Sequence, residues 1–278
     1  MTEYLKGEVN LADPRTIRVF DETTLWGARF GLLLINNIEI RPGLKIIDLG
    51  CATGFPLFEL AHLYDRNCDF VGIDTWKQAL DRAREKLEVY ELPNLSLVNA
   101  DGAAMPIASA QIDLVVSNLG INNMAEPETV LSECFRVLKP RGKVALTSNL
   151  NGHMREFYDA YRETLIELGR DRFLKNLDRN EAHRGTRDSI CAMLQSAGFR
   201  VGKTIEDQFN LRYADGSALF RHSLTRLGFL QGWRNVVDPA DEETVFAALE
   251  KKLNDLSAGP GELRLTIPML YVEGEKGP

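Results

Sequence analysis

The chain has 278 residues, of which 44% are hydrophobic and 26% are charged, a composition typical of globular proteins. Its formal net charge of −7 argues against a nonspecific nucleic-acid binder, which would present a basic stripe. The sequence holds no apolar run of membrane-spanning length and no secretory signal pattern, so we expect no membrane span. The cysteines are scattered without paired spacing, which predicts reduced thiols and a cytoplasmic location.

Residues 1–42 form an aromatic leader that ends at Pro42-Gly43. Its aromatic residues and the apolar run Leu32–Ile38 predict one or two helices that pack across the following domain. We therefore predict a leader or lid at 1–42 and a main domain at 43–278.

Strand and helix patterns alternate regularly between residues 45 and 148. This alternation predicts an α/β fold with a doubly wound, mostly parallel sheet, in which ligands bind at the carboxyl ends of the strands. The predicted strands are Lys45–Leu49, Asp69–Asp74, Asn94–Ala100, Ile112–Ser117 and Lys143–Ser148, with a tight turn at Lys139–Gly142. The predicted helices between them are Phe55–Asp65, Trp76–Tyr90 and Glu126–Leu138.

The pattern changes after residue 148. Apolar spacing predicts one helix within 151–180, another at Thr186–Ala197, and two amphipathic helices within 215–260. Val201–Asp207 and Phe209–Tyr213 are strand-like, and Leu263–Val272 predicts a closing strand. We expect helical insertions at about 150–185 and 215–260, the second just before the last strand. Together they are predicted to form a substrate cap.

The turn at residues 50–54 follows an apolar strand and precedes an amphipathic helix. Glycine and small residues there let a ligand meet bare backbone N–H groups. Three carboxylates, those of Asp48, Asp74 and Asp101, follow three predicted neighbouring strands. They are therefore expected to line one sheet edge, where they can accept hydrogen bonds from a nucleoside.

Five motifs in this order and spacing resemble the class I, Rossmann-like S-adenosylmethionine-dependent methyltransferases, of the small-molecule type often labelled type 11 or UbiE-like. The resemblance covers residues 44–150 and implies a seven-stranded sheet with an antiparallel last strand. The motifs are Asp48–Gly54, Gly72-Ile73-Asp74, Ala100-Asp101-Gly102, Ile112–Asn118 and Leu138–Lys143.

The resemblance implies S-adenosylmethionine as cofactor and assigns roles by position. Asp48 would orient the turn and the cofactor amino group, Asp74 would bind the ribose hydroxyls, and Asp101 would bind the adenine amino group. Asn118 would face the methyl donor. The full implied cofactor-binding set is Asp48, Gly50, Cys51, Gly54, Asp74, Thr75, Trp76, Asp101, Gly102, Ala103 and Asn118.

The turn departs from the family at Ala52, where glycine is usual. A side chain there is expected to exclude any backbone conformation that needs a positive φ. The turn also differs from the Gly-x-Gly-x-x-Gly fingerprint of nicotinamide dinucleotide sites, because residue 52 is alanine and residue 55 is phenylalanine. An NAD(P)-binding oxidoreductase remains an alternative, as does a cofactor-binding protein that is non-catalytic or needs a partner subunit.

The expected reaction is an in-line displacement that transfers a methyl group to a small organic molecule. A general base is needed only when the acceptor atom is poorly acidic or protonated. His153 and His222 are weak candidates for such a role, and no ligand spacing predicts a metal site. Ser117-Asn118-Leu119-Gly120 lacks the Pro-Pro pattern of base-methylating enzymes, so no nucleic-acid partner is expected. The acceptor and the oligomeric state stay open.

Overall fold

The computed structural model describes residues 2–6, 9–21, 24–182 and 184–278. Small parts of the predicted leader and of the first predicted insertion lie outside the described residues. The chain forms two compact units. The sheet unit contains Leu11–Asn149, Thr186–Asp207 and Met269–Pro278, and the helical unit contains Met1–Asn10, Leu150–Gly185 and Gln208–Pro268. The predicted domain boundary between residues 42 and 43 stays a prediction.

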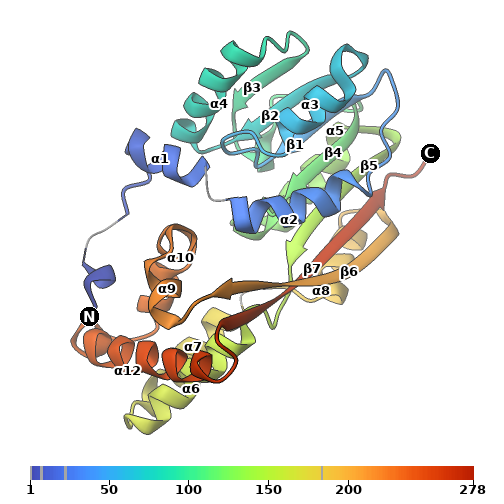
Figure 1. Ribbon diagram of the computed structural model, residues 1–278. Coiled ribbons are helices and arrows are strands. Elements are labelled where there is room, and N and C mark those ends of the chain that lie inside the picture. The colour runs from blue at the N-terminus through green and yellow to red at the C-terminus, as the bar shows by residue number, and fades with distance from the viewer. Residues whose placement is uncertain (1, 7–8, 22–23, 183) are drawn as a thin grey trace. The chain divides into compact units, whose positions relative to one another are not determined.

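A seven-stranded sheet with the order β3-β2-β1-β4-β5-β7-β6 organises the chain (Figure 1). Strands β3, β2, β1, β4 and β5 are parallel neighbours, and β7 runs antiparallel to β5. This confirms the predicted mostly parallel sheet with an antiparallel last strand. The strands are β1 (Lys45–Leu49), β2 (Asp69–Asp74), β3 (Leu95–Asn99), β4 (Ile112–Asn118), β5 (Leu138–Asn149), β6 (Arg200–Tyr213) and β7 (Leu263–Glu275).

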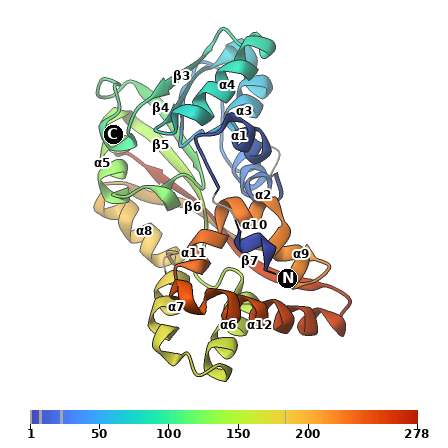
Figure 2. The same cartoon turned by 90° about the vertical axis from the view of Figure 1, so that its left-hand side faces the viewer.

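The central strands are apolar on both faces, because helices of the sheet unit cover both sides. Leu34, Leu60 and Leu80, from three different helices, share one buried cluster with Ile46 of β1 and Phe70 of β2. Figure 2 shows α2, α3 and α4 on one side of these strands and α5 and α8 on the other. The helices are α1 (Pro14–Asp21), α2 (Thr24–Ile35), α3 (Leu57–Tyr64), α4 (Lys77–Tyr90), α5 (Pro127–Val137) and α8 (Arg187–Ser196), with short 3₁₀ turns η2 (Asp65–Asn67), η3 (Gly102–Ala104) and η4 (Ile121–Asn123).

The predicted tight turn at Lys139–Gly142 is wrong, since these residues form an irregularity within β5. Ile112 pairs with Leu138 and Leu114 pairs with Lys143, so the register shifts between the two pairs. Arg141 has a φ of 64°, and its N–H donates to the Lys276 carbonyl. A bulge of this kind lets a strand bend while it keeps its pairing on both sides.

The helical unit is built around aromatic side chains. The rings of Phe157 and Trp233 stack at 3.9 Å between centroids, and those of Tyr4 and Phe220 stack at 4.7 Å. The ring centroids of Phe246 and Phe220 lie 5.7 Å apart. The elements are η1 (Glu3–Leu5), α6 (Arg155–Glu167), η5 (Asp171–Phe173), α7 (Leu174–Glu181), α9 (Gly216–Arg221), α10 (Ser223–Gly228), α11 (Leu230–Arg234) and α12 (Pro239–Ala258).

Two helix predictions in this unit were too long. The single helix expected within 151–180 is divided at Gly169, whose φ of 64° ends α6, as glycine commonly does. The first helix expected within 215–260 is three short helices, because His222 and Phe229 begin new ones. Conversely, the two strand-like segments at 201–213 form the single strand β6. Among the described residues, no helix has the length and apolar character needed to cross a membrane.

Candidate functional site

The turn between β1 and α3 is held by backbone hydrogen bonds to the neighbouring strand. The N–H groups of Gly50 and Cys51 donate to the Ile73 carbonyl of β2 at 2.8 and 3.3 Å. Gly50 and Gly54 have φ angles of 79° and 104°, which glycine adopts at little cost. The sequence therefore places glycine at two positions where the chain must reverse sharply.

Ala52 also has a positive φ, of 44°. The expectation that its side chain would exclude this conformation was wrong, because the surrounding contacts impose it. Its N–H donates to the Asp74 carboxylate at 2.8 Å, and this bond holds the residue in place. A non-glycine residue in this region stores strain of about 1 kcal/mol or more.

Asp74 joins the turn to the start of α4. One carboxylate oxygen of Asp74 accepts a hydrogen bond from the Ala52 N–H, and the other accepts one from the Trp76 N–H at 2.7 Å. A carboxylate has about four acceptor positions, so two remain for a ligand. Thr75, the next residue, is exposed.

Asp48 is almost completely buried, with 1% of its surface exposed. Neither carboxylate oxygen lies in hydrogen-bonding geometry with a described donor. Burial, and secondarily the negative charge of Asp74, raise the pKa of Asp48 to about 7, although the nearby Leu57 N–H at the start of α3 favours the charged form. A buried carboxylate without a partner is costly, and a positively charged ligand group would relieve that cost.

Cys51 is buried beside these carboxylates. Burial, and then the charges of Asp48 and Asp74, raise the pKa of the Cys51 thiol. Because the thiolate is the nucleophilic form, this thiol stays neutral and unreactive at neutral pH. Its small size suits the turn.

Asp101 follows β3 and begins the short helix η3. Its carboxylate accepts from the Ala103 N–H at 2.9 Å, so this N–H already has a partner. Gly102 is buried, and a Cβ added there would lie 3.1 Å from Leu49. This close packing places the Asp101 side chain, which is exposed, beyond the end of β3.

Residues 11–21 of the predicted leader contact the same edge of the sheet unit. The Trp76 indole N–H donates to the Leu11 carbonyl at 3.1 Å, and the Trp76 ring meets Phe20 of α1 edge-on at 5.1 Å. Asp21, at the end of α1, forms ion pairs with Lys86 and Arg82 of α4. Burial alone would raise the pKa of Asp21, but these cations lower it. Helix α1 is thus anchored beside the predicted adenine region.

Asn118, at the end of β4, is fixed on both sides of its amide. It accepts from the Thr147 hydroxyl at 2.8 Å and donates to the Gly27 carbonyl of α2 at 3.2 Å. Just beyond it, a Cβ at Gly120 would lie 2.6 Å from the Leu49 carbonyl oxygen. The loops after β1 and β4 therefore approach each other backbone to backbone.

The sequence reasoning missed a set of polar residues at the ends of β4 and β5. Ser148 and Asn149 are buried, and both hydrogen-bond to Asn122 at 2.7 Å. The available signal was the polar run Thr147-Ser148-Asn149 at the carboxyl end of an otherwise apolar strand. It resembles the strand-end positions that were recognised for Asp48 and Asp74.

His153 and His222, the weak catalytic candidates, belong to the helical unit, whereas the predicted cofactor residues belong to the sheet unit. His222 Nδ1 accepts from the Leu224 N–H at 3.1 Å and so caps α10. His153 is buried, with its ring 5.6 Å from that of Tyr158. Both contacts are of a structural kind.

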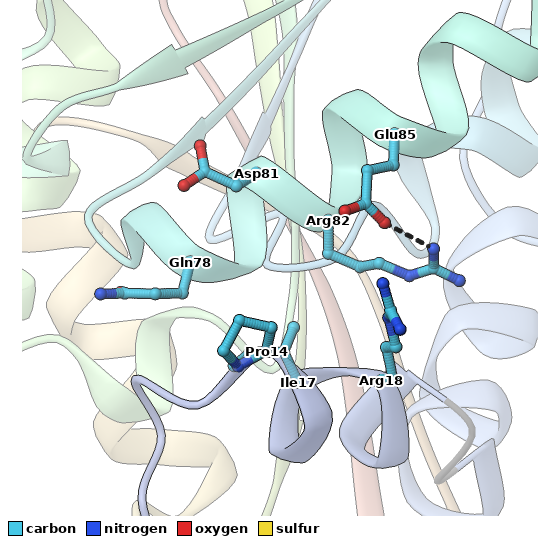
Figure 3. A pocket seen from close by; sticks show the side chains of 7 residues that line it. All are labelled: Pro14, Ile17, Arg18, Gln78, Asp81, Arg82 and Glu85. Atoms are coloured by element: carbon cyan, nitrogen blue, oxygen red, sulfur yellow. Dashed lines mark hydrogen bonds and ion pairs between the residues drawn. The ribbon is translucent and has the colours of Figure 1, made fainter.

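A cavity of about 100 Å³ lies between α1 and α4, lined mainly by charged or polar side chains such as Arg18, Gln78 and Glu85 (Figure 3). Sites for nucleoside-sized ligands usually enclose about 300–1,000 Å³. This cavity is therefore too small for the predicted cofactor, and it marks a packing gap beside the Asp21 ion pairs.

The sheet order defines an α/β protein, and the glycine-rich turn and the strand-end carboxylates form the rim where a nucleoside is predicted to bind. Residues 40–184 match the family model described as a methyltransferase domain. The chain therefore belongs to this methyltransferase family, for which S-adenosylmethionine is the methyl donor. The sheet order also departs from the 3-2-1-4-5-6 order of dinucleotide-binding folds, which disfavours the nicotinamide alternative.

Similar proteins include a demethylmenaquinone methyltransferase of Lactococcus lactis, 31% identical over 45% of this chain and 48% of that protein. The chain thus matches about half the length of this curated relative. A nocamycin O-methyltransferase of Saccharothrix syringae is 24% identical over 88% of this chain and 90% of its own length. The YcgJ protein of Bacillus subtilis has the same fold, with a TM-score of 0.59, 15% identity and coverage of 90% and 99% of the two chains.

Proposed function

We propose that this protein transfers a methyl group from S-adenosylmethionine to a small organic molecule. The observation that carries the proposal is the rim of the sheet unit, where the bare turn at 50–54 lies between Asp48 and Asp74. The buried Asp48 carboxylate, whose oxygens have no donor in hydrogen-bonding geometry among the described residues, fits the amino group of this ligand. The two remaining acceptor positions on Asp74 fit its ribose hydroxyls.

The roles of the residues follow from these contacts. Asp48 holds the amino group of the ligand, the glycine-rich turn lets the amino-acid part of the ligand approach the backbone closely, and Asp74 holds the sugar. Trp76, held by Leu11, offers a flat face beside the base. When bound, S-adenosylmethionine supplies a methyl group on a positively charged sulfur. Alignment of donor and acceptor by such a rigid rim can lower the barrier by about 7–11 kcal/mol.

The relatives support a small organic acceptor. One is named for demethylmenaquinone and another for O-methylation of nocamycin, and both of these acceptors are small organic molecules. A general base is required only where the acceptor atom must lose a proton before or during attack. Neither His153 nor His222 is needed for the proposal.

The test is calorimetric titration with S-adenosylmethionine and S-adenosylhomocysteine. Asp74→Ala should weaken binding by about 1–3 kcal/mol, or about 5- to 150-fold, because a charged acceptor of ribose hydroxyls is lost. Asp69→Ala, at the other end of β2 and exposed, is the matched control and should bind like the parent protein. Equal affinity of the two variants would contradict the proposed position of the ligand.

A non-catalytic or partner-dependent protein is the alternative that the same titration separates. Binding of both nucleosides without transfer of labelled methyl to any small-molecule extract would favour it. The predicted substrate cap at 150–185 and 215–260, the lid at 1–42 and the cytoplasmic location stay predictions. If hydrogen exchange in these segments did not change on addition of cofactor and a substrate analogue, the cap and the lid would be contradicted.

A further inference from the structure

The end of β5 changes abruptly from apolar to polar residues. Val144 and Leu146 are buried in the sheet, and Thr147, Ser148 and Asn149 are equally buried, each with at most 2% of its surface exposed. Polar side chains at such depth need hydrogen-bond partners, and an unmade bond costs about 1–3 kcal/mol. Their partners therefore show what this end of the strand is built for.

Thr147 donates to Asn118, and the Ser148 hydroxyl lies 2.7 Å from Asn122 Oδ1. Asn122 Nδ2 in turn donates to Asn149 Oδ1 at 2.7 Å. The bond from Asn122 engages the Oδ1 side of the Asn149 amide and leaves its Nδ2 group for another partner. Asn149 Nδ2 is buried and has no acceptor among the described residues.

The position of Asn149 relates it to the predicted methyl donor. Thr147 pairs in register with Asn118, the residue that is predicted to face the methyl group. Asn149 follows Thr147 by two residues, so it lies on the same face of β5, about 7 Å farther along the strand. The unused donor is thus at the carboxyl-end rim, next to the predicted reaction centre and within the sheet unit.

We propose that Asn149 is a substrate-binding residue that donates a hydrogen bond from Nδ2 to the oxygen atom that receives the methyl group. The acceptor class is then an acidic hydroxyl compound, a phenol, enol or carboxylic acid. This inference rests on the proposed methyltransferase function and adds the acceptor atom to it.

The transfer balances without a further reactant. The hydroxyl proton leaves to water, and an oxygen lone pair forms the new O–CH₃ bond. The C–S bond breaks, and its electron pair stays on sulfur, which becomes a neutral thioether. A hydrogen bond to the charged oxygen favours its deprotonated form, which reduces the need for a general base.

The experiment uses the full chain with S-adenosylmethionine labelled in the methyl group, incubated with fractionated small-molecule extracts. The labelled product is classed chemically as an ether or ester, an amine, a thioether or a carbon-methylated compound. The same product is then assayed with Asn149→Asp, which keeps the oxygen facing Asn122 but removes the donor. Asn149→Ala is the second variant. Asn123→Asp, at the exposed residue next to Asn122 in η4, is the matched control.

We expect an ether or ester product and a fall in kcat/KM of about 10- to 100-fold in both Asn149 variants, the usual effect of losing a hydrogen bond to a charged group. Affinity for S-adenosylhomocysteine should stay close to that of Asn123→Asp. A product methylated only on nitrogen, sulfur or carbon overturns the inference, as does unchanged kcat/KM. A variant that loses activity together with nucleoside affinity also overturns it, since Asn149 would then support the cofactor site. Absence of any labelled product from a protein that binds cofactor overturns the proposed function itself.

Discussion

The burial of Asp48 makes a quantitative prediction about stability and pH. Its pKa is about 7 in the folded chain and 3.8 in its unperturbed state. Between these values the folded state holds a proton that the unfolded state has lost, so the free energy of unfolding falls as pH rises. The shift of about 3 units corresponds to about 4 kcal/mol, since one unit is worth about 1.36 kcal/mol. This stability is fully present below about pH 3.8 and is lost once the pH passes about 7.

The assay is denaturant unfolding of the parent protein and of Asp48→Asn at several values between pH 4 and pH 8. The amide does not titrate, so the variant should gain stability relative to the parent as pH rises, by about 4 kcal/mol over the full range. Asp69→Asn, an exposed carboxylate on β2, shows the effect of removing a surface charge. A stability difference between Asp48→Asn and the parent that does not vary with pH would refute the reasoning.

The same carboxylate couples pH to ligand binding. The proposed amino-group contact favours the charged form of Asp48, so binding should release a proton when the free protein holds one. Calorimetry below pH 7 in buffers of different ionisation enthalpy measures this release directly. The release should vanish in Asp48→Asn, and a persistent release there would assign it to another group.

Two substitutions test the backbone of the rim. Gly120→Ala should lower the free energy of unfolding by about 1–3 kcal/mol, because the new methyl group would lie 2.6 Å from the Leu49 carbonyl oxygen. Gly27→Ala, whose Cβ meets nothing within 4 Å, is the control. Equal stability of the two variants would contradict the close approach of the two loops. Ala52→Gly should raise the free energy of unfolding by up to about 1 kcal/mol, because it relieves the positive φ of 44°. A marked loss of stability in Ala52→Gly would show that the alanine methyl group contributes packing that outweighs the strain.

The sequence by itself determined the local elements of the sheet unit. Lys45–Leu49 and Asp69–Asp74 are strands with the predicted bounds, because apolar runs bounded by turn residues have few alternatives. The strand-end residues Asp48 and Asp74 could be found in the same way, since parallel strands place their carboxyl ends on one edge. Where a helix contained an unrecognised break, as at Gly169, local periodicity overestimated its length.

Only the tertiary structure decided features that depend on contacts distant in the sequence. The positive φ of Ala52 follows from its bond to Asp74, which lies 22 residues away, and no local preference of alanine predicts it. The bulge in β5 follows from pairing with β4 and from the bond between Arg141 and Lys276. The unused Nδ2 donor of Asn149 depends on Asn122, 27 residues earlier, whose amide bonds to the Oδ1 atom of Asn149 and leaves Nδ2 unpaired among the described residues. A sequence shows which groups a residue carries, but whether a buried group has a partner is decided by the folded chain around it.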